Sequence, residues 1–284
     1  MQDFVINISE YAKSIDPDFI IIPQNGIELA FQDLEPESEL HKNYMHAIDG
    51  FGVEELFYNS AFDPDYERIE MLDLLVGQKK VLVSEFISQS EAISNAIERN
   101  YSRGFVCFPR DASNYDYTQI PDTAIEQNDV DIFSLSQVRN YLYLISSEAF
   151  DSKTELLNAI AATDFDLVIV DLFFEDEAFT FSEINQIKTK SNGARRLVIS
   201  YISVGSAEKY RYYWKNGWGL HHPLWLKRKY DGYEDEFWVK FWKDEWREII
   251  YGNDNSYMKK ILDSGFDGAY LDNVEAYYFL YYKD

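Results

Sequence analysis

The chain has 284 residues, of which 46% are hydrophobic, and a formal net charge of -24 at pH 7. This length suits one large domain or two small ones, and the negative charge disfavours nucleic acid as a partner because phosphates would be repelled. No apolar run reaches the ~18 residues of a membrane helix, and Cys107 is the single cysteine, so no intramolecular disulfide is possible. The acidic surface either aids solubility or attracts a cationic substrate.

Short runs rich in β-branched residues alternate with helical patterns, which indicates βα units and a parallel sheet. In chain order the runs are 18–23, 44–50, 79–86, 104–109, 140–145, 166–173, 196–205 and 268–274. Near-continuous apolar strands are expected where both faces of a sheet are covered. Eight such strands with interleaved helices favour a single α/β domain with a (β/α)8 barrel, the TIM barrel. An open doubly wound sheet is the alternative, although the chain has no G-x-G-x-x-G or P-loop motif.

Helical patterns fill the segments between these runs. Residues 88–104 begin on a serine cap and end at a glycine, and a long pattern over 242–265 leads to the last run. The least patterned stretch is 111–137, which is polar, acidic and weakly periodic. Neither side of it could make a full barrel alone, so we interpret it as a long connection inside one domain that spans residues 1–284.

Acidic and amide side chains gather at the ends of the predicted strands, where a barrel holds its active site. They are Gln24, Asn25, Asp49, Glu54, Glu85, Asp171, Glu208, Asp272 and Asn273. The four histidines form no metal-binding pattern, no G-x-S-x-G motif is present, and Cys107 lies in the middle of a strand. No metal or cofactor is therefore expected. A pair of carboxylates remains, which is the equipment of glycoside hydrolysis.

Each of these residues also has a structural interpretation. Asp171 and Asp49 could cap helices, and Glu85 could pair with a buried basic residue. Gln24 and Asn25 could have no role beyond shaping a turn, since Asn-Gly is a turn signal. The tryptophans would divide between the core and a platform that stacks on sugar rings; they are at positions 214, 218, 225, 238, 242 and 246.

Five stretches together resemble a known family. They are "YISVGSAEKYR", "GFDGAYLDNVEAY", "IIIPQNG", "IDGFGVEELFY" and "VLVSEF". They are similar to the endo-α-1,4-polygalactosaminidases, glycoside hydrolase family 114, whose TIM barrels hydrolyse bacterial exopolysaccharides that contain galactosamine. The first two stretches are long and specific, and the resemblance spans nearly the whole chain.

The order of these stretches differs from that of the family. There the first two belong to the first half, and the other three follow them. The resemblance therefore implies a circular permutant, which in family order begins near 140–145, runs to Asp284 and resumes at Met1. The stretch 111–137 would hold the last helix and join the family's usual termini. Met1 and Asp284 would both lie on the face where the carboxylates converge, and 140–145 would pair with 104–109 to close the barrel.

The resemblance also implies roles for individual residues. Asp272 would attack the anomeric carbon and stay ionised, while Glu54, with the higher pKa, would protonate the leaving oxygen and then activate water. The expected substrate-binding residues are Asp49, Asp171, Glu208, Asn25, Glu85, Tyr201 and Trp242.

These implications together predict an endo-acting, retaining hydrolase of α-1,4-linked galactosamine or N-acetylgalactosamine polysaccharide. A barrel that binds carbohydrate without cleaving it, or a hydrolase of another α-galactoside, are the alternatives. We expect a monomer whose partner is a polysaccharide of cationic character, with no nucleic acid and no membrane span. The N-terminus is polar, so no signal peptide is predicted. A secreted or cell-envelope location is expected, with a leader absent from this sequence.

Overall fold

The computed structural model describes residues 1–281, and its eight main strands are all parallel. Five form one sheet in the order β1-β13-β9-β6-β5, and three form another in the order β2-β3-β4. The bounds are β1 Ile20–Pro23, β2 Gly50–Phe62, β3 Lys80–Ile87, β4 Val106–Arg110, β5 Tyr141–Leu144, β6 Leu167–Asp171, β9 Leu197–Ser203 and β13 Gly268–Asp272. The protein thus has the predicted α/β architecture.

The two sheets meet at both of their edges. A parallel bridge between Gln24 and Gly52 joins the end of β1 to β2. At the other edge β4 lies beside β5, where the rings of Phe108 and Tyr141 are 5.5 Å apart. The expected ladder between these two strands is not found among the described residues, because side chains rather than backbone hydrogen bonds make this contact.

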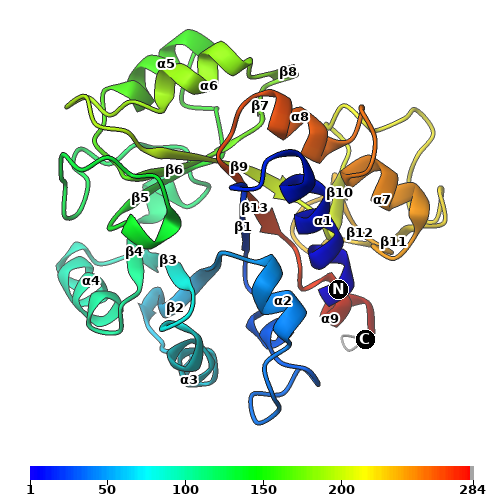
Figure 1. Ribbon diagram of the computed structural model, residues 1–284, viewed down its shortest axis with the longest axis horizontal. Coiled ribbons are helices and arrows are strands. Elements are labelled where there is room, and N and C mark those ends of the chain that lie inside the picture. Colours follow the sequence, from blue (N-terminus) through cyan, green and yellow to red (C-terminus); the bar gives the residue numbers. More distant parts are fainter. Residues whose placement is uncertain (282–284) are drawn as a thin grey trace.

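Helices surround the strands (Figure 1). They are α1 Gln2–Ile15, α2 Lys42–Ala47, α3 Tyr66–Leu75, α4 Ile93–Ser102, α5 Lys153–Ala161, α6 Phe181–Ile187, α7 Asp244–Ile250, α8 Tyr257–Asp263 and α9 Ala276–Tyr281. The single long helix predicted over 242–265 is in fact α7 and α8, because the chain turns between them at Gly252, whose φ is +98°. None of the described helices combines the length and apolar character needed to cross a membrane.

Two small antiparallel units lie outside this parallel arrangement. One is a sheet in the order β10-β12-β11, with β10 Ser206–Glu208, β11 Leu226–Lys229 and β12 Glu236–Val239. The other is the hairpin of β7 Phe173–Phe174 and β8 Glu177–Ala178. Three tryptophans expected either in the core or on a sugar platform are core residues: Trp225, Trp238 and Trp246 are all at most 3% exposed.

The strand predicted at 44–50 is wrong. Most of this run is α2, which begins where the side chain of His41 accepts a hydrogen bond from the backbone N–H of Tyr44. The apolar residues of the run cover the core as one helical face rather than as a strand. Strand β2 starts only at Gly50, so Asp49 precedes the strand instead of following one.

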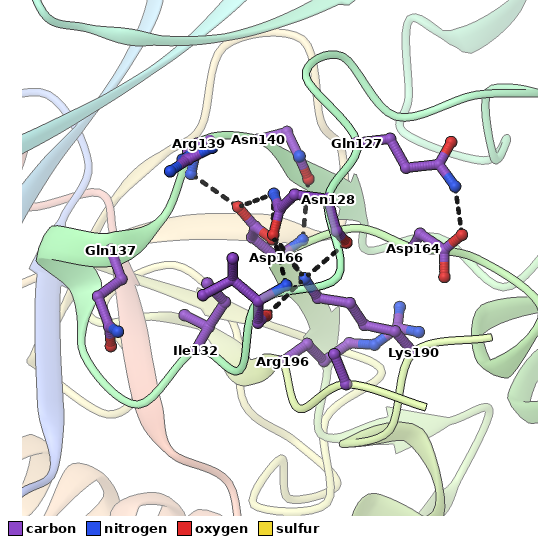
Figure 2. A network of polar contacts seen from close by, with 12 residues as sticks. Gln127, Asn128, Ile132, Gln137, Arg139, Asn140, Asp164, Asp166, Lys190 and Arg196 are labelled. Carbon is purple, nitrogen blue, oxygen red and sulfur yellow. Dashed lines mark hydrogen bonds and ion pairs between the residues drawn. The ribbon is translucent and has the colours of Figure 1, made fainter. Parts of the chain in front are cut away.

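The connection over 111–137 contains two 3-10 turns, Ala112–Asn114 and Leu135–Gln137, and not the helix that was expected there. Its polar composition offers no continuous apolar face, so side-chain hydrogen bonds hold it together with the buried side chains of Tyr117, Ile132 and Leu135. Figure 2 shows the main one of these anchors, a fully buried ion pair in which Lys190 Nζ lies 2.6 Å from Asp166 Oδ1. Asn128 donates to Asp166, and Lys190 donates to the carbonyl of Val130.

The first and last described helices are neighbours (Figure 1). The ring of Phe4 on α1 stacks on Phe241 at 5.9 Å, and the ring of Tyr281 on α9 lies 5.4 Å from Trp242. The expected position of Asp284 falls outside the described residues.

We predict that Lys190→Met strongly destabilises the fold. It leaves the Asp166 carboxylate buried without its cation, a change that typically costs ~3–5 kcal/mol. Urea unfolding followed by circular dichroism measures the loss. Lys259→Met, which removes an exposed pair with Asp263, is the control and should leave the midpoint nearly unchanged. A similarly small effect of both variants would contradict the anchoring role of the buried pair.

Candidate active site

The carboxylate at the end of β13 lies at the centre of the polar strand ends. Asp272 Oδ2 accepts a hydrogen bond of 2.5 Å from the hydroxyl of Tyr201, and Oδ1 accepts one of 2.7 Å from the backbone N–H of Asn273. Burial and, secondly, repulsion by Glu54 raise the pKa of Asp272 to about 7. This differs from the expectation that Asp272 is simply ionised, because two carboxyls share a poorly hydrated space.

Glu54 approaches from β2. Its backbone N–H donates to the side chain of Asn25, which follows β1, and its carboxylate accepts a hydrogen bond from the hydroxyl of Tyr117. Arg110, at the end of β4, lies 3.9 Å from Glu54 and 3.0 Å from Glu55. The pairing of β2 with β3 is irregular after Glu54, and Glu55 has a φ of +54°. This break in strand alternation lets both glutamates reach the same guanidinium.

A second arginine holds two further carboxylates. Arg211 Nε lies 2.6 Å from Glu208 Oε2, and its two terminal nitrogens lie 2.8 Å from the oxygens of Asp171. Tyr210 also donates to Glu208. Asp171 and Glu208 are therefore fixed in place by one guanidinium group, and their role in substrate binding stays a prediction.

Three other carboxyls of the site form no ion pair within residues 1–281: those of Asp272, Glu236 and Glu275. Burial, with repulsion by Glu208, raises the pKa of Glu236 to about 8. Burial, with repulsion by Asp272 and Glu28, raises the pKa of Glu275 to about 7. Burial and like charges oppose the ionisation of these three groups and no ion pair offsets them, so their pKa values lie near neutral pH.

The backbone after β13 is shaped for this position. Asn273 has a φ of +60°, and a Cβ on Gly205 would lie 1.8 Å from the carbonyl oxygen of Asn273. Only glycine permits that approach, so the loop after β9 and the loop after β13 touch backbone to backbone. The contact sets the direction in which the chain leaves Asp272.

Two of the expected substrate-binding residues lie elsewhere. Glu85 is fully buried and accepts hydrogen bonds from the backbone N–H groups of Phe57 and Tyr58 and from Asn100, so its contacts are structural. Asp49 lies before β2, at the opposite end of the strand from Glu54, where it pairs with Lys13. The positions of both residues speak against contact with a substrate.

The other expected residues divide in two. Asn25 contacts Glu54 and Tyr201 contacts Asp272. Glu208 lies close enough for its charge to raise the pKa of Asp272, and Arg211 holds Asp171 beside Glu208. The ring of Trp242 instead packs against Phe241 and Tyr281.

Sequence reasoning gave no site role to three residues: Arg110, Tyr117 and Glu236. Arg110 directly follows a predicted strand, which was a usable signal. Tyr117 lies in the weakly patterned connection and Glu236 in an antiparallel hairpin, so no βα pattern pointed to them. In the described part of the chain no group of three His, Cys, Asp or Glu residues is arranged to hold a metal ion.

Residues 143–284 match the model of glycoside-hydrolase family GH114. The chain belongs to this family. The matched half contains Asp272 with Asp171, Glu208 and Tyr201, whereas Glu54 lies outside it and is joined to the site by geometry alone.

Relatives are known from distant organisms, and each is described only as an uncharacterized protein. The chain is 35% identical to one from Methanocaldococcus jannaschii over 45% of its own length and 36% of the relative. It is 34% identical to one from Deinococcus radiodurans over 43% of its length and 37% of the relative. A protein of Thermotoga maritima is 30% identical over 42% of this chain and 35% of the relative. The chain thus spans little more than a third of these relatives.

We predict that stability rises as the pH falls from 8 to 5. The pKa of Asp272 is raised from 3.8 to about 7 in the folded protein. A carboxyl that binds its proton more tightly when folded stabilises the fold below its unfolded pKa, and this gain is lost as the pH rises through the folded pKa. For such a shift, the contribution of Asp272 to the free energy of unfolding changes by at most ~4 kcal/mol.

Urea unfolding at both pH values measures this dependence. Asp272→Asn should show a smaller difference between pH 5 and pH 8, whereas the exposed control Asp176→Asn should keep the wild-type difference. An unchanged pH dependence in Asp272→Asn would show that this carboxyl does not hold a proton near neutrality.

Proposed function

We propose that this chain is an endo-acting, retaining glycoside hydrolase of α-1,4-linked galactosamine or N-acetylgalactosamine polysaccharide. Membership of family GH114 supports a glycoside hydrolase. The observation that carries the proposal is the convergence of Asp272 and Glu54, from two different strand ends, closely enough for the charge of Glu54 to raise the pKa of Asp272. Two facing carboxyls are the groups that glycoside hydrolysis requires.

The scaffold of this site is, in our proposal, a closed (β/α)8 barrel formed by residues 1–284 as one domain. The strands follow one another from β5 through β6, β9, β13, β1, β2 and β3 to β4, and β4 lies beside β5 again. In such a barrel the side chains at the carboxyl ends of the strands converge. This placement accounts for the meeting of residues more than two hundred positions apart.

In the first step Asp272 attacks the anomeric carbon, and the bond to the leaving oxygen breaks as that oxygen takes the proton of Glu54. In the second step Glu54 takes a proton from water, the water oxygen bonds to the anomeric carbon, and Asp272 is released. The pair needs one proton in total, on Glu54. Once Glu54 is neutral its repulsion vanishes, and the donors Tyr201 and Asn273 N–H stabilise the Asp272 anion.

The charge of the site favours a cationic sugar polymer. Asp272, Glu236 and Glu275 have no ion-pair partner within residues 1–281, and the whole chain carries a net charge of -24. A protonated amine on the substrate would supply the missing positive charge. This supports a polymer that contains unacetylated galactosamine over a neutral α-galactoside.

We also infer that the chain is a circular permutant of the family barrel. The family match begins at residue 143, within β5, and α1 and α9 are neighbours. A gene rearranged to start at residue 138, with residue 284 joined to residue 1 by a glycine-serine linker, tests this. We expect the rearranged protein to fold cooperatively and to keep the activity, because the linker joins neighbouring helices. Loss of cooperative unfolding would contradict the inference.

We predict that Asp272→Asn and Glu54→Gln each abolish release of reducing ends from partially deacetylated polygalactosamine. Loss of a general acid alone typically costs ~10²-fold or more. The matched controls Asp176→Asn and Glu177→Gln change the same groups on the exposed β7–β8 hairpin and should keep wild-type rates. NMR of the first product should show the α anomer, as retention requires.

Other outcomes separate the alternatives. Binding of the polymer without any new reducing end would favour a binding protein over an enzyme. Cleavage only of small α-galactosides would favour a different substrate. Near-wild-type turnover in either site variant would refute the roles of these two carboxyls.

A further inference from the structure

Glu236 is a carboxyl that the proposed reaction leaves without a role, although it lies at the site. It begins β12, and its neighbour across the sheet is Glu208 on β10. Glu208 is paired with Arg211, whereas Glu236 forms no ion pair within residues 1–281. An ionised carboxyl in this position would destabilise the fold, because no ion-pair partner offsets the loss of hydration. The group is therefore expected to be kept neutral.

A chain of hydrogen bonds runs from Glu236 to Asp272. The hydroxyl of Ser206 donates to Glu236 Oε1 and is itself bonded to Ser203 at 2.6 Å. The amide nitrogen of Asn273 lies 2.9 Å from the Ser203 hydroxyl and 3.1 Å from that of Ser206. These groups are buried, so they connect the start of β12 with the end of β13.

The amide of Asn273 lies evenly between the two carboxyls. Its nitrogen is 3.4 Å from Glu236 Oε1 and 3.4 Å from Asp272 Oδ2, and its oxygen accepts a hydrogen bond from Tyr230 at 3.1 Å. A hydrogen bond to an ionised acceptor is roughly twice as strong as one to a neutral acceptor. The two N–H groups of this amide are also shared with the hydroxyls of Ser203 and Ser206, so the carboxyl that carries the negative charge draws the amide toward itself.

We propose that Glu236 is a positioning residue for the reaction: as a neutral acid it leaves the Asn273 amide to Asp272, and as an anion it takes the amide and opposes the charge on Asp272. This proposal rests on the function proposed for Asp272. Asp272 then works as an anion only while Glu236 keeps its proton.

The surroundings of Glu236 agree with a neutral state at pH 7. Burial, then repulsion by Glu208 and by Asp272, raises the pKa of Glu236 to about 8, against the Ser206 hydrogen bond and the charge of Arg211. Four tyrosines also lie close enough for the charge of Glu236 to raise their pKa values: Tyr201, Tyr213, Tyr230 and Tyr233. The tyrosines lie on β9, in the segment after β10 and in the β11–β12 hairpin, and Asp272 ends β13.

The kinetic test compares Glu236→Gln with the wild type on the amino-sugar polymer between pH 6 and pH 10. The amide of glutamine cannot ionise, so the fall of kcat on the alkaline side should move up by about one pH unit or more. Glu234→Gln, an exposed change on the same hairpin, should keep the wild-type profile. An alkaline limb that stays in place in Glu236→Gln would overturn the proposal.

A second measurement needs no substrate. The side-chain carboxyl carbon of Glu236 is followed by ¹³C NMR during a pH titration of the wild type and of Asp272→Asn. Removing the charge of Asp272 should lower the pKa of Glu236 by at least ~0.5 unit. If the polymer is not cleaved but this shift is seen, the function is wrong and the coupling stands. If Glu236 titrates independently of Asp272, the proposal fails whatever the activity.

Discussion

Electrostatic repulsion among buried carboxyls is the constraint on which the rest of this site depends. Arg110 binds Glu54 and Glu55, and Arg211 binds Asp171 and Glu208, so two guanidinium groups hold four carboxylates. The carboxyls of Asp272, Glu236 and Glu275 form no ion pair within residues 1–281, so protons and neutral hydrogen-bond donors relieve most of their repulsion. This is why their pKa values rise into the range where an enzyme exchanges protons. A site of this kind stores electrostatic strain in the folded state.

The fold tolerates that strain because rigid strands present the carboxyls. Asp272 ends a central strand that pairs with β1 on one side and with β9 on the other. The close contact at Gly205 then fixes the loop that follows it. At a mobile loop such repulsion between carboxyls would be relieved by movement. Here the strands hold the carboxyls in place, so the repulsion raises their pKa values instead.

The sequence predicted the elements whose patterns are local and regular. Seven of the eight strand runs lie mostly within strands of the structure, and the carboxylates at 171, 208 and 272 follow from their places at strand ends. Glu54 lies inside β2, and its role was implied by the family resemblance. The predicted place of Asp49 after a strand is wrong for a local reason. The run 44–50 reads as one strand, but α2 takes most of it and β2 begins only at its last residue. At Glu85 the structure adds what position along a strand does not reveal: backbone N–H groups already bind its carboxylate. Glu236 and Tyr117 come from segments without periodic pattern, and only tertiary packing brings them to the site.

The connection over 111–137 shows why such a segment matters. Near its end Asn128 is tied to the buried pair of Asp166 and Lys190 at the start of β6 (Figure 2). Near its beginning the hydroxyl of Tyr117 donates to Glu54, and the Tyr117 ring stacks on Tyr143 of β5 at 4.0 Å. One irregular segment therefore links the strand edge between β4 and β5 to the carboxylate of β2. Both the buried anchor and the site carboxylate thus depend on this one segment, so we expect the stability of the connection and the geometry of the site to be coupled.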